Sequence, residues 1–579
     1  MRGGSLGARG AAAALVLALT LGLVPSHASR ESALNVQSSN AFLLAESVNL
    51  GPVAPDTTLE LVMILRNPAH AKQAADIAAM YSPKSPKFGQ ALTARQVAEQ
   101  YGPSPETAHR LIAALRSIGL TATWQHGNEW VAVSGPAKRI ESAFHVQATW
   151  YRSPHGTRYY AGDRDPVVPT VLVPYVQEVG RLSNYFEPAT YAVPAGGLAP
   201  DDLLGAYDIT PLRKLGLDGT GETVAFFEFD GFSQQDLDTF TTKYNFPPIQ
   251  AQIKAGPTFD PGGETEMDLE VVHEIAPGAK LVLYNMDMTT AIKSAKSDAD
   301  VLQAMLQLQT KMINENPGAI LSQSWGTCEK PFGQALADAF SKLYDNADSL
   351  RESSFVSTGD NAAYECLRVS NRGTAPTADL LSIPLPSSVP GTTAVGGTRL
   401  SVSTNKGWYN ETVWEDPVET NGTGGGLSMY FPRPAWQQGP GVVDQQLNPR
   451  GMRSVPDVSA DADPMSGAAI YSSEGKGGGA WGAGGGTSQS APIWAGIAAL
   501  INQYLKQKGQ PSLGFANPAL YHIAANANAY PAIAFHDIVM GNNLYYPATK
   551  NYDMATGLGT PDAWNLAQDL VVYDQGGGQ

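Results

Sequence analysis

A serine that follows a glycine run is the first residue in this sequence whose type and position suit chemistry. The glycines of 484–486 lead to Ser488, and apolar residues then recur at helical spacing from Trp494 to Leu505, which predicts a helix that begins at the serine. The free N–H groups and the dipole of a helix N-terminus favour developing negative charge, and glycines let a substrate backbone come close. Ser488 is therefore a candidate nucleophile; the alternative interpretation is a serine that only caps the helix.

A pair of carboxylates offers the base that such a nucleophile needs. Glu264 and Asp268 stand four residues apart and share one face of a helix predicted over 264–275. Two like charges held close raise the pKa of one group and allow a proton to be shared, which gives a base that works in acid, where histidine is protonated. The acidic C-terminal part holds only three histidines, none in a setting typical of a catalytic base: His273, His522 and His536. The alternative interpretation of the carboxylates is an acid-rich first helical turn, which the dipole favours.

Two blocks of secondary structure must position these residues, and the first covers 30–186. Strands are predicted over 59–65 and 130–135, and helices over 73–81, 95–101 and 106–119. This mixture predicts a small α+β domain. The stretch 187–202 follows with three prolines and a Gly-Gly pair, which is typical of an exposed linker open to proteolysis.

The second block covers 199–573 and alternates buried strands with helices. The predicted strands are 224–229, 281–284, 319–325 and 354–358, and the predicted helices are 264–275, 289–312 and 332–346. Strand–helix alternation predicts an α/β fold with a mostly parallel sheet and helices on both of its faces.

The first residues predict export. Arg2 and Arg9 precede an apolar run over 11–24, and a small-x-small site ends at Ala28, as in a secretory signal peptide. The run is short for a bilayer crossing, and no other segment reaches about 18 apolar residues. We therefore expect a secreted protein with no membrane attachment after signal removal; the alternative is a membrane-anchored N-terminus.

The charge is acidic overall and unevenly placed. The formal net charge is −16, and a chain with so few clustered cations is not expected to bind nucleic acid. Residues 1–200 hold 16 Lys and Arg against 13 Asp and Glu, a net of +3, whereas 201–579 hold 22 against 41, a net of −19. We expect the two parts to attract each other.

The only two cysteines are Cys328 and Cys366, which excludes a thiolate metal cluster. In an oxidising compartment they could form one disulfide, which would contribute about 4 kcal/mol in the chain-entropy model. Two buried free thiols are the open alternative, because the sequence does not give their separation.

Several motifs, taken together and in order, resemble the sedolisins, the serine-carboxyl peptidases, and within them kumamolisin-like proteins. The resemblance covers nearly the whole chain after the signal. The motifs are SPKFGQALTARQVAEQYGPS (85–104), GGETEMDLEVVHEIAPGAKLVLY (262–284), LSQSWG (321–326), STGDNA (357–362), AVGGTRL (394–400), GGGLSMYFPRPAWQ (424–437), RSVPDVSADADP (453–464) and GGGTSQSAPIWAGIAALINQ (484–503).

The resemblance implies a role for each matching residue. Ser488 is the expected nucleophile, Glu264 the base that removes its proton, and Asp268 the partner that orients Glu264. Asp360 occupies the position of the oxyanion aspartate, which must be protonated to donate a hydrogen bond to the tetrahedral intermediate. The accessory residues that kumamolisin-type members couple to this triad match Glu228 and Trp325.

A structural calcium ion is also implied, because the C-terminal region resembles the family's calcium site. Asp537 and Asp553 would supply carboxylates, and Ile538, Thr549 and Asn551 main-chain carbonyls, which are the hard oxygen ligands that one Ca²⁺ prefers. The family usually has glycines at the last two positions, so Thr549 is the least typical of the ligands.

Other departures limit what the resemblance implies. No acidic residue directly precedes Leu385-Pro386, where some kumamolisins place one for substrate choice, so a preference for basic side chains is not transferred. Two glycosylation sequons begin at Asn410 and Asn421, which is informative only in a eukaryote.

These observations predict a secreted, acid-active serine-carboxyl endopeptidase that processes itself from a proenzyme. The expected parts are a signal peptide (1–28), an activation prodomain (29–186), a linker with the maturation site (187–202), a subtilisin-like catalytic domain (199–573) and a tail (574–579). The expected partners are peptide or protein substrates and the protein's own prodomain as an intramolecular inhibitor, and we expect a monomer. The alternatives are a tripeptidyl exopeptidase with the same triad and a non-catalytic binding protein on the same scaffold.

Overall fold

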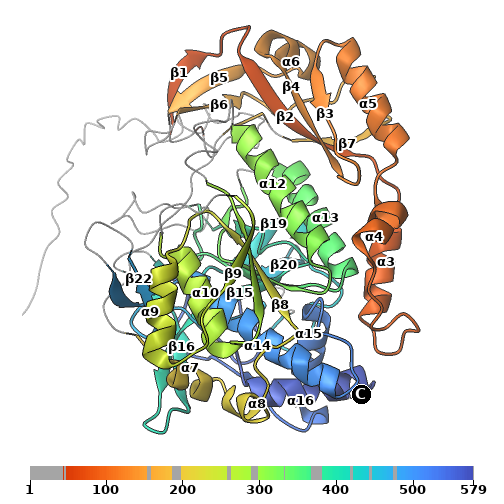
Figure 1. Ribbon diagram of the computed structural model, residues 1–579. Coiled ribbons are helices and arrows are strands. Elements are labelled where there is room, and N and C mark those ends of the chain that lie inside the picture. Colours follow the sequence, from red (N-terminus) through yellow and green to blue (C-terminus); the bar gives the residue numbers. More distant parts are fainter. Residues whose placement is uncertain are drawn as a thin grey trace, which may run out of the picture.

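The computed structural model gives the fold of most of the chain (Figure 1). It describes residues 44, 47–152, 158–180, 182–184, 197–256, 262–287, 298–330, 333–366, 381–417, 421–442, 446–473 and 479–577. The predicted signal peptide, most of the predicted linker and the last two residues of the predicted tail lie outside these residues.

The described part of the N-terminal domain contains two antiparallel sheets and four helices. One sheet has the order β1 (Val48–Pro52), β5 (Ala148–Arg152), β6 (Arg158–Gly162); the other has the order β3 (Thr121–Thr123), β4 (Trp130–Pro136), β2 (Thr58–Leu65), β7 (Val176–Val179). The helices are α3 (His70–Met80), α4 (Ala94–Tyr101), α5 (Pro105–Ser117) and α6 (Ala137–Phe144). The predicted α+β character of this block is confirmed, and the predicted strands and helices fall within observed elements to within two residues.

Strand β2 shows why this domain docks on the rest of the chain. Its alternate residues Leu59, Leu61 and Met63 pack into the domain's own core with α5 and α6. Val62 and Ile64 point to the opposite face, where they pack against two helices of the C-terminal domain, α12 (Asp298–Glu315) and α13 (Gly333–Ser349). The sheet is therefore apolar on both faces, and the second face shares one apolar cluster with α12 and α13 and with Val97 and Tyr101 of α4.

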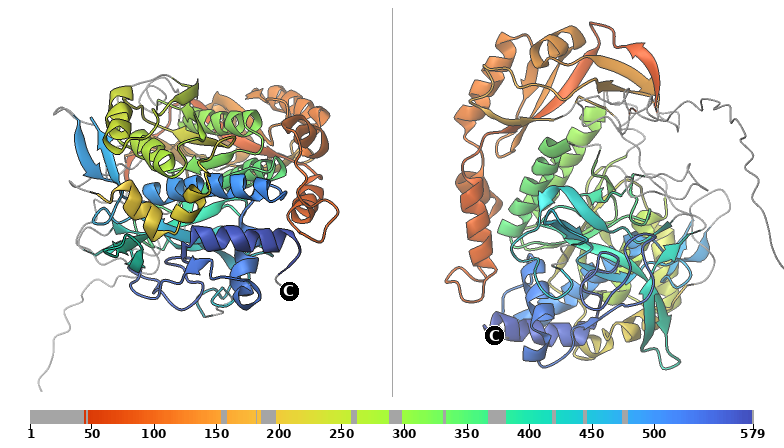
Figure 2. Two further views of the ribbon diagram at one scale, coloured as in Figure 1. Left: turned by 60° about the horizontal axis from the view of Figure 1, so that its bottom comes forward. Right: turned by 180° about the vertical axis from the view of Figure 1, so that it is seen from behind.

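A helical arm of the N-terminal domain makes a second contact. Helices α3 and α4 run alongside the C-terminal domain in both views of Figure 2. The Tyr81 hydroxyl donates to the carbonyl of Asp348 at 2.7 Å, and the Gln73 amide donates to the Ser349 hydroxyl at 3.2 Å. These bonds hold the arm against the C-terminal end of α13.

The C-terminal domain is built on an eight-stranded sheet. Its order is β16 (Trp408–Val413), β15 (Thr393–Val402), β13 (Ser353–Ser357), β11 (Ile320–Gln323), β8 (Thr223–Glu228), β10 (Lys280–Asn285), β9 (Ala251–Ala255), and β21 (Val458–Asp461) also pairs with β15. Every pairing is parallel except that of β15 with β16. The predicted mostly parallel sheet is confirmed, and the four predicted strands correspond to β8, β10, β11 and β13.

Helices cover both faces of this sheet, as predicted. Val224 and Phe226 of β8 pack toward α10 (Glu264–Ile275) and α14 (Thr487–Gln507), and the alternate residues Ala225 and Phe227 pack toward α12 and α13. Glu228 continues the first series, so the alternation of the strand directs it toward α10.

The remaining elements surround this framework. The helices are α7 (Pro200–Ala206), α8 (Thr210–Lys214), α9 (Gln234–Tyr244), α15 (Asn517–Ala525), η3 (Ala527–Ala529) and α16 (Ala563–Asp574). The short strands are β12 (Thr327–Cys328), β14 (Pro384–Leu385), β17 (Glu415–Asp416), β18 (Asn421–Gly422), β19 (Gly426–Pro432), β20 (Met452–Val455), β22 (Ala469–Ser472), β23 (Ala480–Ala483), β24 (Phe535–His536) and β25 (Thr560–Pro561). Among the described helices, none combines the length and the apolar character that a membrane crossing needs.

Candidate active site

The candidate site lies where parallel strands end and two helices begin. Strand β8 ends at Glu228, β11 is followed by Ser324 and Trp325, and Asp360 follows β13. Helix α10 begins at Glu264 and α14 at Thr487. The carboxyl ends of parallel strands are the usual position of sites in such sheets, because the loops there leave a crevice.

Ser488 is the second residue of α14 and is partly exposed. Its hydroxyl donates to the Ser324 carbonyl at 3.4 Å, which is a long hydrogen bond, and it also interacts with the Glu264 carboxylate and lowers the pKa of that group. Gly486 before it has a φ of 76°, and a side chain there would place its Cβ 2.5 Å from Asp360 Oδ2. Gly486 is thus required by its positive φ and by its close packing against Asp360.

Glu264 and Asp268 lie one helical turn apart on α10, as the spacing predicts. Asp268 is fully buried, and both of its carboxylate oxygens accept from the Ser324 hydroxyl, at 2.9 and 2.8 Å. Burial raises the pKa of Asp268 well above its usual value, and the nearby Glu264 raises it further. Burial likewise raises the pKa of Glu264, with Glu228 as the next cause. The two groups therefore favour their protonated forms more than ordinary carboxyls do.

Glu228 and Trp325 extend this pair. The indole N–H of Trp325 donates to Glu228 Oε2 at 2.8 Å, and Glu228 also hydrogen-bonds with Asp268. Burial raises the pKa of Glu228 well above its usual value, and the charge of Asp268 is the next cause. Two buried carboxyls in contact are more stable when they share a proton, so this geometry favours one proton shared by Glu228 and Asp268.

Asp360 lies against the start of α14, where it bonds Thr487, the residue before Ser488. Its Oδ1 accepts from the Thr487 main-chain N–H at 2.8 Å and from the Thr487 hydroxyl at 2.9 Å. Burial raises the pKa of Asp360 to about 6, although both bonds to Thr487 lower it. Because both donors bind Oδ1, Oδ2 is the oxygen that can carry the proton below that pH.

The three histidines of the C-terminal domain make their contacts elsewhere. Burial lowers the pKa of His273 to about 4, and its Nε2 lies 2.7 Å from the Pro247 carbonyl. The ring of His536 stacks on Trp408 at 4.4 Å between centroids, and the ring of His522 lies against Tyr573. Among the described residues, none of these rings is in contact with Ser488.

Two residues of the site were missed by the sequence analysis. Ser324 bonds both Asp268 and the Ser488 carbonyl, the latter at 3.1 Å, and so connects the two helices. Asp230 follows Glu228 by two residues, and its carboxylate accepts the N–H groups of Glu264 and Thr265 at the start of α10. The i, i+2 spacing from Glu228 was the available signal for Asp230; the contact of Ser324 depends on how strand and helix pack.

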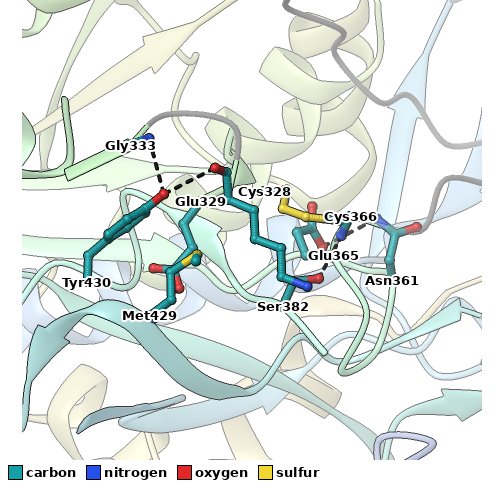
Figure 3. Close-up of a disulfide and its surroundings, with 10 residues drawn as sticks. Cys328, Glu329, Gly333, Asn361, Glu365, Cys366, Ser382, Met429 and Tyr430 are labelled. Atoms are coloured by element: carbon teal, nitrogen blue, oxygen red, sulfur yellow. Dashed lines mark hydrogen bonds between the residues drawn. A yellow bond between two sulfur atoms is a disulfide. The ribbon is translucent and has the colours of Figure 1, made fainter. Parts of the chain in front are cut away.

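A disulfide joins Cys328 and Cys366, with their Cα atoms 5.1 Å apart (Figure 3). It links the segment after Trp325 to the segment after Asp360 at the rim of the site. The two cysteines, for which the sequence allowed either a disulfide or free thiols, are therefore bonded to each other. Beside the disulfide, the buried Glu329 accepts from the Ser428 hydroxyl at 2.9 Å and from the main-chain N–H of Met429 at 2.6 Å. The rim is therefore fixed both by a covalent bond and by hydrogen bonds.

The predicted calcium ligands meet at one loop. Asp537 Oδ2 accepts the N–H of Asn551 at 3.0 Å, and Asp553 Oδ2 accepts the N–H of Thr549 at 2.9 Å. Asn551 has a φ of 66°, which asparagine tolerates, whereas Thr549 is not among the residues with positive φ. A threonine at position 549 therefore causes no backbone strain. Among the described residues, no group of three or more His, Cys, Asp and Glu is suited to hold a metal ion. The predicted calcium site has two carboxylates, those of Asp537 and Asp553.

Family models match both domains. The description "Pro-kumamolisin, activation domain" matches residues 45–185, and "Subtilase family" matches residues 251–519. The first range covers the N-terminal domain and the second contains Glu264, Asp268, Asp360 and Ser488.

Relatives align over most of the chain. Kumamolisin from Bacillus sp. strain MN-32 is 29% identical over 91% of this chain and 94% of its own, and sedolisin from Pseudomonas sp. strain 101 is 29% identical over 87% and 85%. Tripeptidyl-peptidase 1 from Bos taurus is 25% identical over 90% and 93%. The solved structure of Pseudomonas sedolisin (serine-carboxyl proteinase) complexed with two molecules of pseudo-iodotyrostatin superposes with a TM-score of 0.52 and 28% identity, over 64% of this chain and 97% of that one.

The fold, the site and these matches define a serine-type peptidase with a subtilisin-like catalytic domain and an N-terminal activation domain. An activation domain marks the chain as a zymogen. Within that class, the chain is sedolisin-like and, by its activation domain and its similarity to kumamolisin, kumamolisin-like.

Proposed function

We propose that this protein is a secreted, acid-active serine-carboxyl endopeptidase that hydrolyses peptide bonds with a Ser488–Glu264–Asp268 triad. The observation that carries the proposal is the position of Ser488 at the start of α14, where it interacts with Glu264 and where no described histidine contacts it. A carboxylate base suits acid, since a histidine base would be protonated there.

In the acylation step, Ser488 Oγ attacks the carbonyl carbon of the scissile peptide bond while Glu264 takes the hydroxyl proton. A tetrahedral intermediate forms, and its oxyanion accepts a hydrogen bond from the protonated Asp360. When the C–N bond breaks, Glu264 returns the proton to the leaving amine, which leaves an ester on Ser488. Water then attacks this ester by the same route, with Glu264 again taking and returning a proton.

Asp268, Glu228 and Trp325 keep Glu264 in the ionised form that this step needs. The proton shared by Asp268 and Glu228 removes a negative charge that would otherwise raise the pKa of Glu264. The Trp325 indole and the Ser324 hydroxyl hold the two carboxyls in place. Asp268, Glu228 and Trp325 are therefore proposed to position Glu264 and to tune its pKa, and they do not touch the substrate.

One structural Ca²⁺ is proposed at the loop of 549–553. The residues fit the ion, because Asp537 and Asp553 converge on this loop and Asn551 already has the left-handed φ that a glycine would supply. Main-chain carbonyls of Ile538, Thr549 and Asn551 would complete an oxygen site. The ion would stabilise the folded loop and would take no part in hydrolysis.

The N-terminal domain is proposed to act as an intramolecular chaperone and inhibitor. Its second sheet packs on α12 and α13, and the arm of α3 and α4 contacts the end of α13. A cut within the predicted linker of 187–202 would then separate it from a catalytic domain that begins near α7. The mature enzyme is proposed to be exported through the predicted signal peptide and to act outside the cell, and a monomer is proposed as its oligomeric state.

The test is acidification of the purified full-length protein. We expect conversion to a form that begins within 187–202, and then cleavage of a long peptide at internal bonds, both measured by mass spectrometry. Ser488→Ala should abolish both reactions. Release of successive tripeptides from the peptide N-terminus would favour the tripeptidyl alternative, which the similarity to tripeptidyl-peptidase 1 keeps open. Wild-type protein that cleaves nothing at any pH would favour a binding protein on this scaffold.

A further inference from the structure

Asp230 stands just beyond β8, and its carboxylate is bonded to the helix that carries the proposed base. Oδ2 accepts the main-chain N–H of Glu264 at 3.2 Å, and Oδ1 accepts that of Thr265 at 3.2 Å and also the Thr265 hydroxyl. The backbone of Glu264 itself is therefore held by a carboxylate from a neighbouring strand.

Helix α10 needs this contact, because its own N-cap residue has no side chain. The N-cap is Gly263, with a φ of 89°, and its N–H is taken by Glu266 Oε2 at 3.2 Å. The next two N–H groups, those of Glu264 and Thr265, would ordinarily bond a Ser, Thr, Asp or Asn at the N-cap or would bond water. Asp230 supplies the missing acceptor from outside the helix.

The glycine pair before the helix fits the same explanation. A Cβ on Gly262 would lie 2.3 Å from Asp230 Oδ2, so a side chain there would displace the carboxylate. Gly263 is required by its positive φ. Asp230 is in turn held from β10, because the Asn285 amide donates to its carbonyl at 3.1 Å. The chain thus provides both the space and the support for Asp230 at this point.

Among the described residues, the charged groups that face Glu264 are carboxyls: Glu228 on β8, Asp268 on α10 and Asp360 after β13. Glu266 on α10 faces Asp230 instead. Burial raises the pKa of Asp230, and its hydrogen bonds with Thr265 and Glu264 oppose that rise. Burial is also the main cause of the raised pKa of Glu264, and the charge of Asp230 adds to the charge of Glu228. Asp230 therefore makes Glu264 a stronger base than the other carboxyls alone would.

We propose that Asp230 is a positioning residue of the serine-carboxyl reaction, which fixes the first turn of α10 under Glu264 and strengthens Glu264 as a base through its negative charge. The inference rests on the proposed function, since it has this meaning only if Glu264 is the base. Asp230 touches neither the substrate nor Ser488 in this role.

The test is the pH dependence of kcat/KM in acid-matured Asp230→Asn, which keeps the shape and removes the charge. The acidic limb should move to lower pH by about one unit, because Glu264 loses a neighbouring negative charge. Displacement of the first turn should lower kcat by about 10- to 100-fold with KM nearly unchanged. Asp230→Ser, which keeps a short acceptor beside Gly262, should show the same shift of the limb.

Glu266→Gln is the structural control, because it replaces a carboxyl in the same turn of α10 that caps Gly263 and does not bond Glu264. Burial raises the pKa of Glu266 to about 8, so this substitution removes no charge in acid. It should leave the acidic limb in place. An unmoved limb in Asp230→Asn, in an enzyme whose wild type depends on Glu264 and Ser488, would overturn the inference and leave the proposed function intact. A wild type that does not depend on Glu264 would overturn the proposed function instead. Failure of both Asp230 variants to fold would also contradict the inference, since a positioning role predicts a folded but slower enzyme.

Discussion

Single side chains show how one site can hold a base and an acid that are both carboxyls. In the proposed mechanism Glu264, which contacts Ser488, is needed ionised, whereas Asp360, which bonds the start of α14, is needed protonated. Burial raises the pKa of both groups, so burial alone does not separate them. The separation is proposed to come from their neighbours, because Glu228 and Asp268 hold a shared proton beside Glu264, and both donors to Asp360 bind one oxygen.

The role of Asp360 predicts where activity ends at higher pH. Burial raises its pKa to about 6, so the proposed hydrogen bond from protonated Asp360 to the oxyanion is available below that pH and is lost above it. Asp360→Asn keeps a donor at every pH. We expect this variant to lose about tenfold in kcat in acid but to retain that rate through pH 7, as measured with a peptide substrate. A variant whose activity still falls near pH 6 would show that another group sets the upper limb.

Sequence reasoning found the residues of this site that are linked by a motif. Spacing alone predicted the helix under Glu264 and Asp268, and the resemblance supplied Asp360, Glu228 and Trp325. Sequence reasoning missed Asp230, whose partners are main-chain N–H groups of α10, and Ser324, whose partner is the Asp268 carboxylate on a helix distant in sequence. Such contacts depend on the approach of β8 and β11 to α10, which local periodicity does not report.

Secondary-structure elements explain why these side chains meet. Strand β8 alternates apolar residues between two helical layers, so its last residue Glu228 must face α10. Helices α10 and α14 pack against each other and both begin at the carboxyl edge of the sheet, which brings Glu264 and Ser488 together. The type of each element was predictable from the periodicity of its apolar residues and the length of the segment. The order of the strands across the sheet was not, because it depends on pairing between segments far apart in the sequence.

The loop of 549–553 carries the prediction at this scale. If it binds Ca²⁺, adding the ion at a hundred times its dissociation constant should stabilise the fold by about 2.7 kcal/mol, and chelator should reverse the effect. Asp537→Ala should abolish the response with a small direct cost, because this side chain is exposed. Asp238→Ala, at another exposed aspartate, is the control and should respond like wild type. A wild-type melting temperature that ignores both calcium and chelator would exclude the site.

At the scale of the whole molecule, the activation domain and the catalytic domain form one packed body. The second sheet of the N-terminal domain has an apolar outer face, which packs in one cluster with α12, α13 and part of α4. The sequence predicted two attracting parts from their net charges, but the contact is dominated by apolar residues such as Val62, Ile64 and Phe340. Charge therefore acts at the edges of this interface and does not hold its centre.

Glu178 is such an edge group. It lies on β7 opposite Asp338 of α13, and burial, followed by the charge of Asp338, raises its pKa to about 7. Because the pKa of Glu178 is raised in the folded zymogen, protonated Glu178 contributes its full stabilisation of the folded state at pH values below the ordinary pKa near 4.5. This contribution is lost as the pH rises through about 7. The uncut zymogen should therefore be tighter in acid at this point, so release of the prodomain needs the linker to be cut first.

Glu178→Gln in the Ser488→Ala zymogen tests this sign. The melting temperature should rise relative to the parent at pH 8, where Glu178 is ionised, and the two proteins should melt alike at pH 4. Thermal unfolding at both values measures the difference. A gain of equal size at both values would show that charge is not the cause.

The pH profile of kcat/KM for the mature enzyme, measured with and without Glu264→Gln, tests the central claim most directly. A carboxylate base with a protonated Asp360 predicts a maximum in acid and a fall toward neutrality. Glu264→Gln keeps the shape and removes the basicity, so kcat should fall by about 1,000-fold or more with the melting temperature nearly unchanged. The control His522→Gln should retain nearly full turnover. Activity that climbs as the pH rises through about 6.5, where imidazole loses its proton, or near-normal turnover in Glu264→Gln, would contradict the serine-carboxyl assignment.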